Sequence, residues 1–200
     1  KLAVGRDGRN RASLRPLGSK TGRNQPSTTK FIFGPAKWVR GLIKPEKGMA
    51  IAYCDWSSQE IAIAAALSGD QRLWEAYSSG DPYIAFAVAA GLAPDGATKE
   101  THKDVRNRCK PVVLGTNYGM SAYGVAQAAQ ISELEAKVLL RKHYETYYEF
   151  WKWAENNKER GLLRLKLETC FGWSIQVTAG DVKANTFLKW PIQAHGAEML

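Results

Sequence analysis

The sequence lacks the features of three classes of protein. Its three cysteines, Cys54, Cys109 and Cys170, are an odd number without a C-x-x-C spacing, which excludes an obvious disulfide framework or zinc site. No apolar run reaches the ~18 residues of a membrane span. Residues 1–10 also lack the apolar core of a signal peptide. We therefore expect a cytoplasmic protein that has no membrane partner.

Acidic residues are scarce in the first quarter of the chain. Residues 1–50 contain 12 Lys and Arg but two acidic residues, whereas the other 150 residues contain 16 basic and 17 acidic ones. The hydrophobic content of 44%, with seven Trp and eight Tyr, is typical of a folded globular protein. The basic first quarter indicates binding to a polyanion, although a solvated basic tail would have the same composition.

The order of turn signals and apolar runs predicts an α+β fold that is mostly helical with a small antiparallel sheet. Residues 1–30, rich in Gly, Arg, Ser and Pro, read as an extended arm. The predicted elements are a buried strand at 49–54, a buried helix at 59–67, a helix from Asp81-Pro82 to about Ala90, a helix at about 98–118, a shorter helix from Ser121, a long helix capped by Ser132 and Glu135, a hairpin within 162–178 around Gly172, and a last helix from near Asp181.

Two carboxylates flank the junction between the predicted strand and the first buried helix. Asp55 follows the strand, where a rigidly held carboxylate could bind a metal ion or cap the next turn. Glu60 follows Ser57, and this spacing also fits a capping box in which Glu60 bonds back to the Ser57 backbone. From the residues alone, Asp55 could be a metal ligand or a cap, and Glu60 could belong to a capping box or have another role.

The segment VRNRCKPVVLGTNYGMS (105–121) carries the most specific pattern. Arg106, Lys110, Leu114 and Tyr118 recur every four residues and therefore share one helical stripe. Two cations one turn apart can bind a phosphate chain, with an apolar residue and an aromatic ring beside them for a base or sugar. The alternative is an amphipathic helix with solvated cations. Pro111 requires either a later helix start or a kink.

Four motifs resemble those of the family A DNA polymerases, and they occur along the chain in the order that the family has. DWSSQE (55–60) resembles their motif A, D-Y-S-Q-I-E, and RNRCKPVVLGTNYG (106–119) resembles their motif B, R-x3-K-x3-F-x3-Y-G. TGR (21–23) resembles a primer–template contact segment, and PIQAHGAEML (191–200) resembles P-V-Q-G-T-A-A-D-L-M. The resemblance covers residues 21–200 and implies a DNA-directed DNA polymerase, with the palm and fingers of the right-hand fold.

The resemblance implies roles for the matching residues. The reaction would be attack of a primer 3′-OH on the α-phosphate of a dNTP. Asp55 and the backbone carbonyl of Trp56 would bind two catalytic Mg²⁺ ions. The nucleotide-binding residues would be Gln59, Glu60 as the gate against a ribose 2′-OH, Arg106 and Lys110 on the triphosphate, Leu114, and Tyr118 at the template base. Lys110 would also donate a proton to pyrophosphate. Arg23, Gly119 and Gln193 would contact primer–template DNA.

The sequence departs from the family pattern in several places. Leu114 replaces a Phe, as in viral and phage-type members, and Tyr83 and Asn185 replace the usual His and Arg of bacterial members. The expected division is a basic arm and first palm part at 1–70, fingers at 71–180, and a return to the palm at 181–200. In the family that the chain resembles, a second metal-binding Asp belongs to an H-D motif C, which comes after the segment that residues 191–200 resemble. We therefore expect a longer parent chain with a thumb and the rest of the palm, and little synthesis by these residues alone.

Two other functions fit parts of the pattern. A single-subunit RNA polymerase shares the motif B Lys and the Tyr-Gly pair, but it needs a small residue where this chain has Glu60. A non-catalytic nucleic-acid-binding module that has kept the fold would also bind DNA in a salt-dependent manner.

Overall fold

The computed structural model describes residues 4–26, 31, 37–180 and 183–200, and it divides the chain into two units, residues 1–57 and 58–200. The first unit contains the antiparallel strands β1 (Leu14–Arg15) and β2 (Gln25–Pro26), in which Leu14 pairs with Pro26 and Arg15 with Gln25. A 3₁₀-helix follows at Lys37–Leu42. Regular structure is therefore sparse in the described part of this unit.

The predicted buried strand at 49–54 is wrong. The segment is extended and exposed, with Met49 69%, Ile51 56% and Tyr53 68% accessible, and it pairs with no described strand. A β-strand is stabilised by hydrogen bonds to a neighbour, so an apolar run without a pairing partner does not form one. Within this unit the Tyr53 ring instead lies 5.7 Å from the Arg40 guanidinium carbon.

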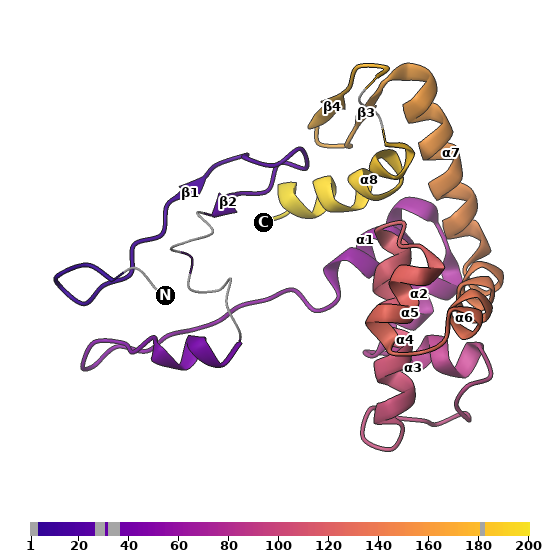
Figure 1. Cartoon of the computed structure of the whole chain (residues 1–200), viewed down its shortest axis with the longest axis horizontal. Helices are drawn as coiled ribbons and strands as arrows, with labels where there is room; N and C mark the ends of the chain where they lie inside the picture. Colours follow the sequence, from indigo (N-terminus) through magenta and orange to yellow (C-terminus); the bar gives the residue numbers. More distant parts are fainter. Residues whose placement is uncertain (1–3, 27–30, 32–36, 181–182) are drawn as a thin grey trace. The chain divides into compact units, whose positions relative to one another are not determined.

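The second unit is mostly helical (Figure 1). In the described residues its elements are α1 (Gln59–Ser68), α2 (Gln71–Ser78), α3 (Pro82–Ala89), α4 (Lys103–Asn117), α5 (Ala122–Ala129), α6 (Glu133–Thr146), α7 (Tyr148–Arg164), β3 (Lys166–Glu168), β4 (Ser174–Gln176) and α8 (Ala184–Glu198). The hairpin β3–β4 is antiparallel, with Leu167 opposite Ile175. The prediction of a mostly helical chain with little antiparallel sheet is confirmed.

Local signals in the sequence explain where three of the described helices begin. Asp81 accepts hydrogen bonds from the Tyr83 and Ile84 backbone N–H groups at 3.2 Å, and Pro82 occupies the first turn of α3. Ser121 caps α5, and Ser132 and Glu135 form the predicted capping box of α6. These predictions are confirmed. The Asp181 start predicted for the last helix lies outside the described residues.

Other helix boundaries differ from the prediction. Helix α4 begins at Lys103 and not near 98, because Thr98 and Thr101 exchange side-chain and backbone hydrogen bonds that close a turn before it. Pro111 lies inside this helix. The long helix expected after Ser132 is two helices, α6 and α7, separated at Tyr147, whose φ of −114° and ψ of 55° are not helical.

A buried cluster joins α1 to α7 and positions the site described below. Its largest buried members include Ile61, Phe86, Val112 and Phe150. Asp70 links two helices, because its Oδ1 accepts from Leu73 N at 2.9 Å in α2 and its Oδ2 accepts from Phe150 N at 3.0 Å in α7. One buried carboxylate therefore caps two helices that are far apart in the sequence.

The second cluster packs α8 against the hairpin and α7, which runs from the helical cluster to β3 and β4 (Figure 1). Phe187, Trp190 and Ala194 of α8 are buried there with Leu167 and Ile175. A Cβ on Gly161 of α7 would come within 2.4 Å of the Phe187 ring, so glycine allows the close approach of these two helices.

Candidate functional site

The two cations of the predicted phosphate-binding stripe lie against one aromatic ring. The Arg106 guanidinium carbon is 4.9 Å from the centre of the Tyr83 ring, and Lys110 Nζ is 5.8 Å from it. Arg106 and Lys110 come from α4 and Tyr83 from α3. The spacing of four residues has therefore placed both cations on one side of the helix, as predicted. Attraction between cations and the ring face favours this arrangement.

Tyr83 itself is buried, with 8% of its surface exposed. Burial raises the pKa of its hydroxyl, while a hydrogen bond with Ser58 and the nearby positive charge of Arg106 act in the opposite direction. The hydroxyl is thus neutral near pH 7. The sequence marked Tyr83 only as a replacement for the usual His of bacterial members, and its place two residues after the helix-capping Asp81 was the signal that could have found it.

Arg106 is also held by a carboxylate. Its Nε donates to Asp81 Oδ2 at 2.5 Å, and the two side chains are 24% and 21% exposed. Such partly buried, charge-assisted hydrogen bonds are stronger than exposed ion pairs. The sequence indicated Asp81 as a helix cap but contained no local signal for this bond, because 25 residues separate the partners.

Glu60 and Tyr118, two residues with predicted nucleotide roles, are in contact within the second unit. The Tyr118 hydroxyl donates a hydrogen bond to Glu60 Oε2, although 58 residues separate them. The capping-box interpretation of Glu60 is wrong, since α1 starts after Ser58, whose left-handed φ of 49° leaves it without a side-chain cap bond. The Glu60 carboxylate instead accepts a hydrogen bond from Tyr118, which follows the last residue of α4.

Of the other predicted nucleotide and DNA residues of this unit, Gln59 and Gly119 bond to α8 and Gln193 belongs to it. Gln59 Nε2 donates to the Gly196 carbonyl at 3.2 Å. The Gly119 carbonyl accepts from Asn185 Nδ2 at 3.1 Å, and Gly119 has a φ of +64°, which favours glycine. Gln193 is half-buried on α8. Leu114 is half-buried against the core cluster.

The remaining predicted residues belong to the first unit. Asp55 and Trp56 are exposed in an extended segment, so the predicted presentation of Asp55 by a buried strand is wrong. Arg23 closes a turn in which its backbone N–H donates to Ser19 Oγ at 2.9 Å. Within the described ranges, no three His, Cys, Asp or Glu side chains are grouped so that they could hold a metal ion.

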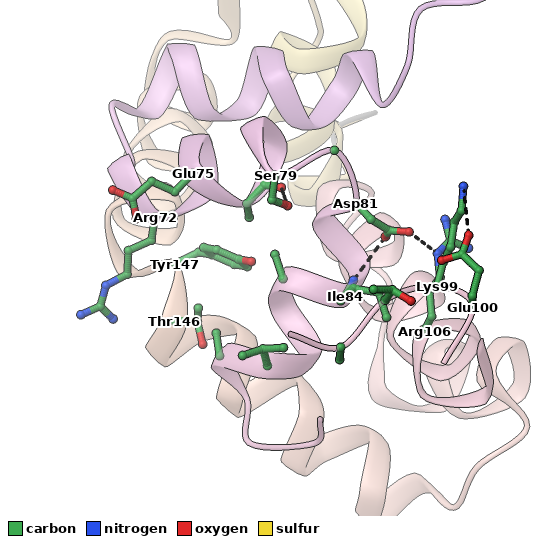
Figure 2. Close-up of a pocket in the computed structure, with 17 residues that line it drawn as sticks. Arg72, Glu75, Ser79, Asp81, Ile84, Lys99, Glu100, Arg106, Thr146 and Tyr147 are labelled. Carbon is green, nitrogen blue, oxygen red and sulfur yellow. Dashed lines mark hydrogen bonds and ion pairs between the residues drawn. The ribbon is translucent and has the colours of Figure 1, made fainter. Parts of the chain in front are cut away.

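A cavity of about 870 Å³ lies beside the Asp81–Arg106 pair. Its lining comes from α2, α3, residues 97–100 and the junction of α6 and α7. Figure 2 shows Asp81 bonded to Arg106 at one end, near Glu100, with Tyr147 and Arg72 at the other end. The Arg106 side chain thus borders an open volume as well as the Tyr83 ring.

In the part of the chain that the structure describes, no helix combines the length and the apolar character needed to cross a membrane.

Comparison with known proteins identifies relatives over nearly the whole chain. The family model for DNA polymerase family A matches residues 24–197. DNA polymerase I of Aquifex aeolicus is 28% identical over 98% of this chain and 34% of its own length. The thermostable DNA polymerase I of Thermus filiformis is 27% identical over 86% of this chain and 21% of its own length.

A solved structure is similar to the chain as well. The POL domain of Pol1 from M. smegmatis, in complex with DNA primer-template and dNTP, superposes with a TM-score of 0.74 and 26% identity, covering 98% of this chain and 37% of that one. The chain therefore spans between 21% and 37% of the lengths of the proteins named here. These relatives are bacterial, and the resemblance of Leu114 to phage and viral members is not supported.

Proposed function

Because this chain belongs to the family A DNA polymerases, we propose that it forms part of an enzyme for template-directed DNA synthesis. In this proposal residues 1–70 and 181–200 contribute to the palm, and residues 71–180 form the fingers. The observation that carries it is the cluster of Arg106, Lys110 and Tyr83 on α3 and α4, which collects two cations beside a buried ring. A cytoplasmic location stays a prediction.

The cluster suits a nucleoside triphosphate. Arg106 presents a planar fork for phosphate oxygens, and Lys110, whose side chain is exposed, adds a point charge one turn away. Leu114 and Tyr118 follow along the same stripe, where they would lie beside the nucleotide and the template base. The Lys110 amino group would also lie close enough to the leaving pyrophosphate to donate a proton to it.

Selection of the sugar is assigned to Glu60. Its carboxylate is fixed by the Tyr118 hydroxyl, so it would be held in place beside the incoming sugar and disfavour a 2′-OH. This arrangement disfavours the alternative of a single-subunit RNA polymerase, which must admit that hydroxyl. Gln59, which bonds to α8, would support the same side of the site.

Binding of primer–template DNA is assigned to Arg23, Gly119 and Gln193. The net charge of +10 in residues 1–50 would attract the DNA backbone. The M. smegmatis neighbour was solved with DNA primer-template and dNTP, which supports the same partners for this chain. The rest of a polymerase, including a thumb, would be the remaining partner.

Oxygen donors for magnesium come from Asp55 and the Trp56 carbonyl. An exposed carboxylate and a carbonyl oxygen are ligands of the kind that Mg²⁺ prefers. In this proposal these two residues would supply part of the metal site, and the rest of the polymerase would supply its other ligands. Two bound Mg²⁺ ions would activate the primer 3′-OH and stabilise the leaving oxygens.

Primer extension by the full-length protein and its Asp55→Ala variant tests this function. We expect the rate to fall on the order of 10³-fold or more, because a lost metal ligand removes several kcal/mol of transition-state stabilisation. Asp95→Ala, which removes an exposed carboxylate in a loop of the second unit, is the matched control and should keep full activity. An Asp55→Ala protein that extends primers normally would contradict the metal-ligand role of Asp55, whereas a parent protein that binds DNA but extends no primer would favour the non-catalytic binding module.

A further inference from the structure

Asp81 occupies a position from which it can control Arg106. Its Oδ2 accepts the Arg106 Nε–H at 2.5 Å, in a pair that is about three-quarters shielded from solvent. We propose that Asp81 is a positioning residue, which orients the Arg106 guanidinium for the triphosphate of an incoming dNTP. This inference rests on the proposed function, and it assigns to Asp81 a role beyond capping a helix.

The same carboxylate fixes both the guanidinium and the ring on which it packs. While Oδ2 holds Arg106, Oδ1 accepts the backbone N–H groups of Tyr83 and Ile84 at the start of α3. The Tyr83 ring lies 4.9 Å from the Arg106 guanidinium carbon. Arg106 is therefore held at its edge by Asp81 and at its face by Tyr83, and Asp81 sets the position of both.

The bond leaves the phosphate-binding atoms of Arg106 available. Asp81 accepts from Nε, whereas the two terminal amino groups are outside this hydrogen bond. A guanidinium has five N–H donors in a fixed plane, so fixing one edge orients the others. Asp81 thus directs the remaining donors without competing for them.

The neighbouring cavity explains why Arg106 needs to be held. Arg106 and Glu100 both line this volume of about 870 Å³, and Figure 2 shows Arg106 between Asp81 and the Lys99–Glu100 segment. A long side chain beside an open volume has many accessible rotamers, and ordering it on nucleotide binding costs entropy. Asp81 removes most of these rotamers before the nucleotide arrives, which is preorganisation of the binding group.

Two substitutions separate this role from helix capping. Asp81→Asn keeps a good N-cap acceptor but loses the charge that holds Arg106. Asp81→Glu keeps the charge but is a weaker cap. In steady-state primer extension by the full-length protein, we expect Asp81→Asn to raise the KM for dATP about tenfold with kcat within about twofold, at an unchanged melting temperature. Asp81→Glu should recover part of the KM and lower the melting temperature.

Arg106→Ala and the double variant complete the test. If Asp81 acts through Arg106, Asp81→Asn should change KM no further in the Arg106→Ala background. Asp104→Asn, an exposed acid in the first turn of α4, is the matched control and should leave KM unchanged.

The outcomes distinguish the inference from the function on which it rests. An unchanged or lower KM for Asp81→Asn, or equal effects in both backgrounds, would overturn the positioning role while Arg106→Ala still raised KM. If Arg106→Ala itself left KM unchanged, the nucleotide site proposed above would fail, and the positioning role with it.

Discussion

The two units of this chain use their apolar residues in opposite ways. In the described part of the first unit Val39 is the only buried apolar side chain, while Trp38, Ile51 and Trp56 are more than half exposed. In the second unit, helices cover one another and bury two clusters that include Phe86 and Phe187 completely. Stability from burial therefore belongs to the second unit, and the first contributes exposed charge and aromatic surface.

The largest difference in stability between the two units should come from removing one buried aromatic ring. We expect Phe86→Ala to lower the free energy of unfolding by about 3–5 kcal/mol, because the side chain is fully buried and leaves a cavity. Trp38→Ala in the first unit, where the side chain is 76% exposed, should change it by about 0.5 kcal/mol or less. Urea unfolding followed by circular dichroism measures both. Equal losses would show that the first unit has a core of its own.

Removing a hydrogen-bonded carboxylate should also destabilise the second unit more than the first. Asp70→Ala should cost about 2–4 kcal/mol, since it removes a helix cap and leaves the buried Phe150 N–H without its acceptor. Asp7 in the first unit also accepts hydrogen bonds, from Arg11 at 3.0 Å and from the Arg9 backbone, but its side chain is 47% exposed. Asp7→Ala is the control in the same urea assay and should leave the midpoint unchanged. A normal midpoint for Asp70→Ala would contradict the two-helix cap.

Acid should destabilise the second unit through His143. Burial lowers the pKa of this imidazole from 6.5 to about 3, and the ring stays neutral between Thr116 and Trp151. The unfolded chain binds a proton below pH 6.5 that the folded chain does not, so stability is complete above pH 6.5 and falls from there toward pH 3. Between pH 7.5 and 5.0 the free energy of unfolding should drop by about 2 kcal/mol.

The control for this prediction is His143→Gln, which should flatten the pH dependence in urea titrations even if the variant is less stable. The first unit contains no histidine, so its variants should keep the slope of the parent. A parent with no slope between pH 7.5 and 5.0 would show that His143 is accessible to protons.

Local sequence signals predicted what is local in the structure. Ser121, Ser132 and the Asp81-Pro82 pair start helices within a few residues of themselves, so their patterns were sufficient. The four-residue spacing of Arg106 and Lys110 likewise predicted a shared helix side, which the Tyr83 ring confirms.

The failures concern partners that are distant in the sequence. Residues 49–54 have the composition of a strand but lack a pairing neighbour in the described structure, which composition does not reveal. Glu60 matched a capping box, yet its carboxylate bonds to Tyr118, 58 residues away. Asp81 was recognised as a cap, whereas its bond to Arg106 depends on how α3 packs on α4. Nothing local to these residues encodes their tertiary partners.

The double cap by Asp70 has a consequence for the order in which the second unit folds. Its bond to Leu73 closes within one turn and can form as soon as α2 does. Its bond to Phe150 closes a separation of 80 residues, so it forms only after the intervening helices have docked. We therefore expect this contact to be absent from the transition state, so that losing it accelerates unfolding more than it slows folding. Asp70 should therefore slow the unfolding of the second unit while leaving its folding rate nearly unchanged.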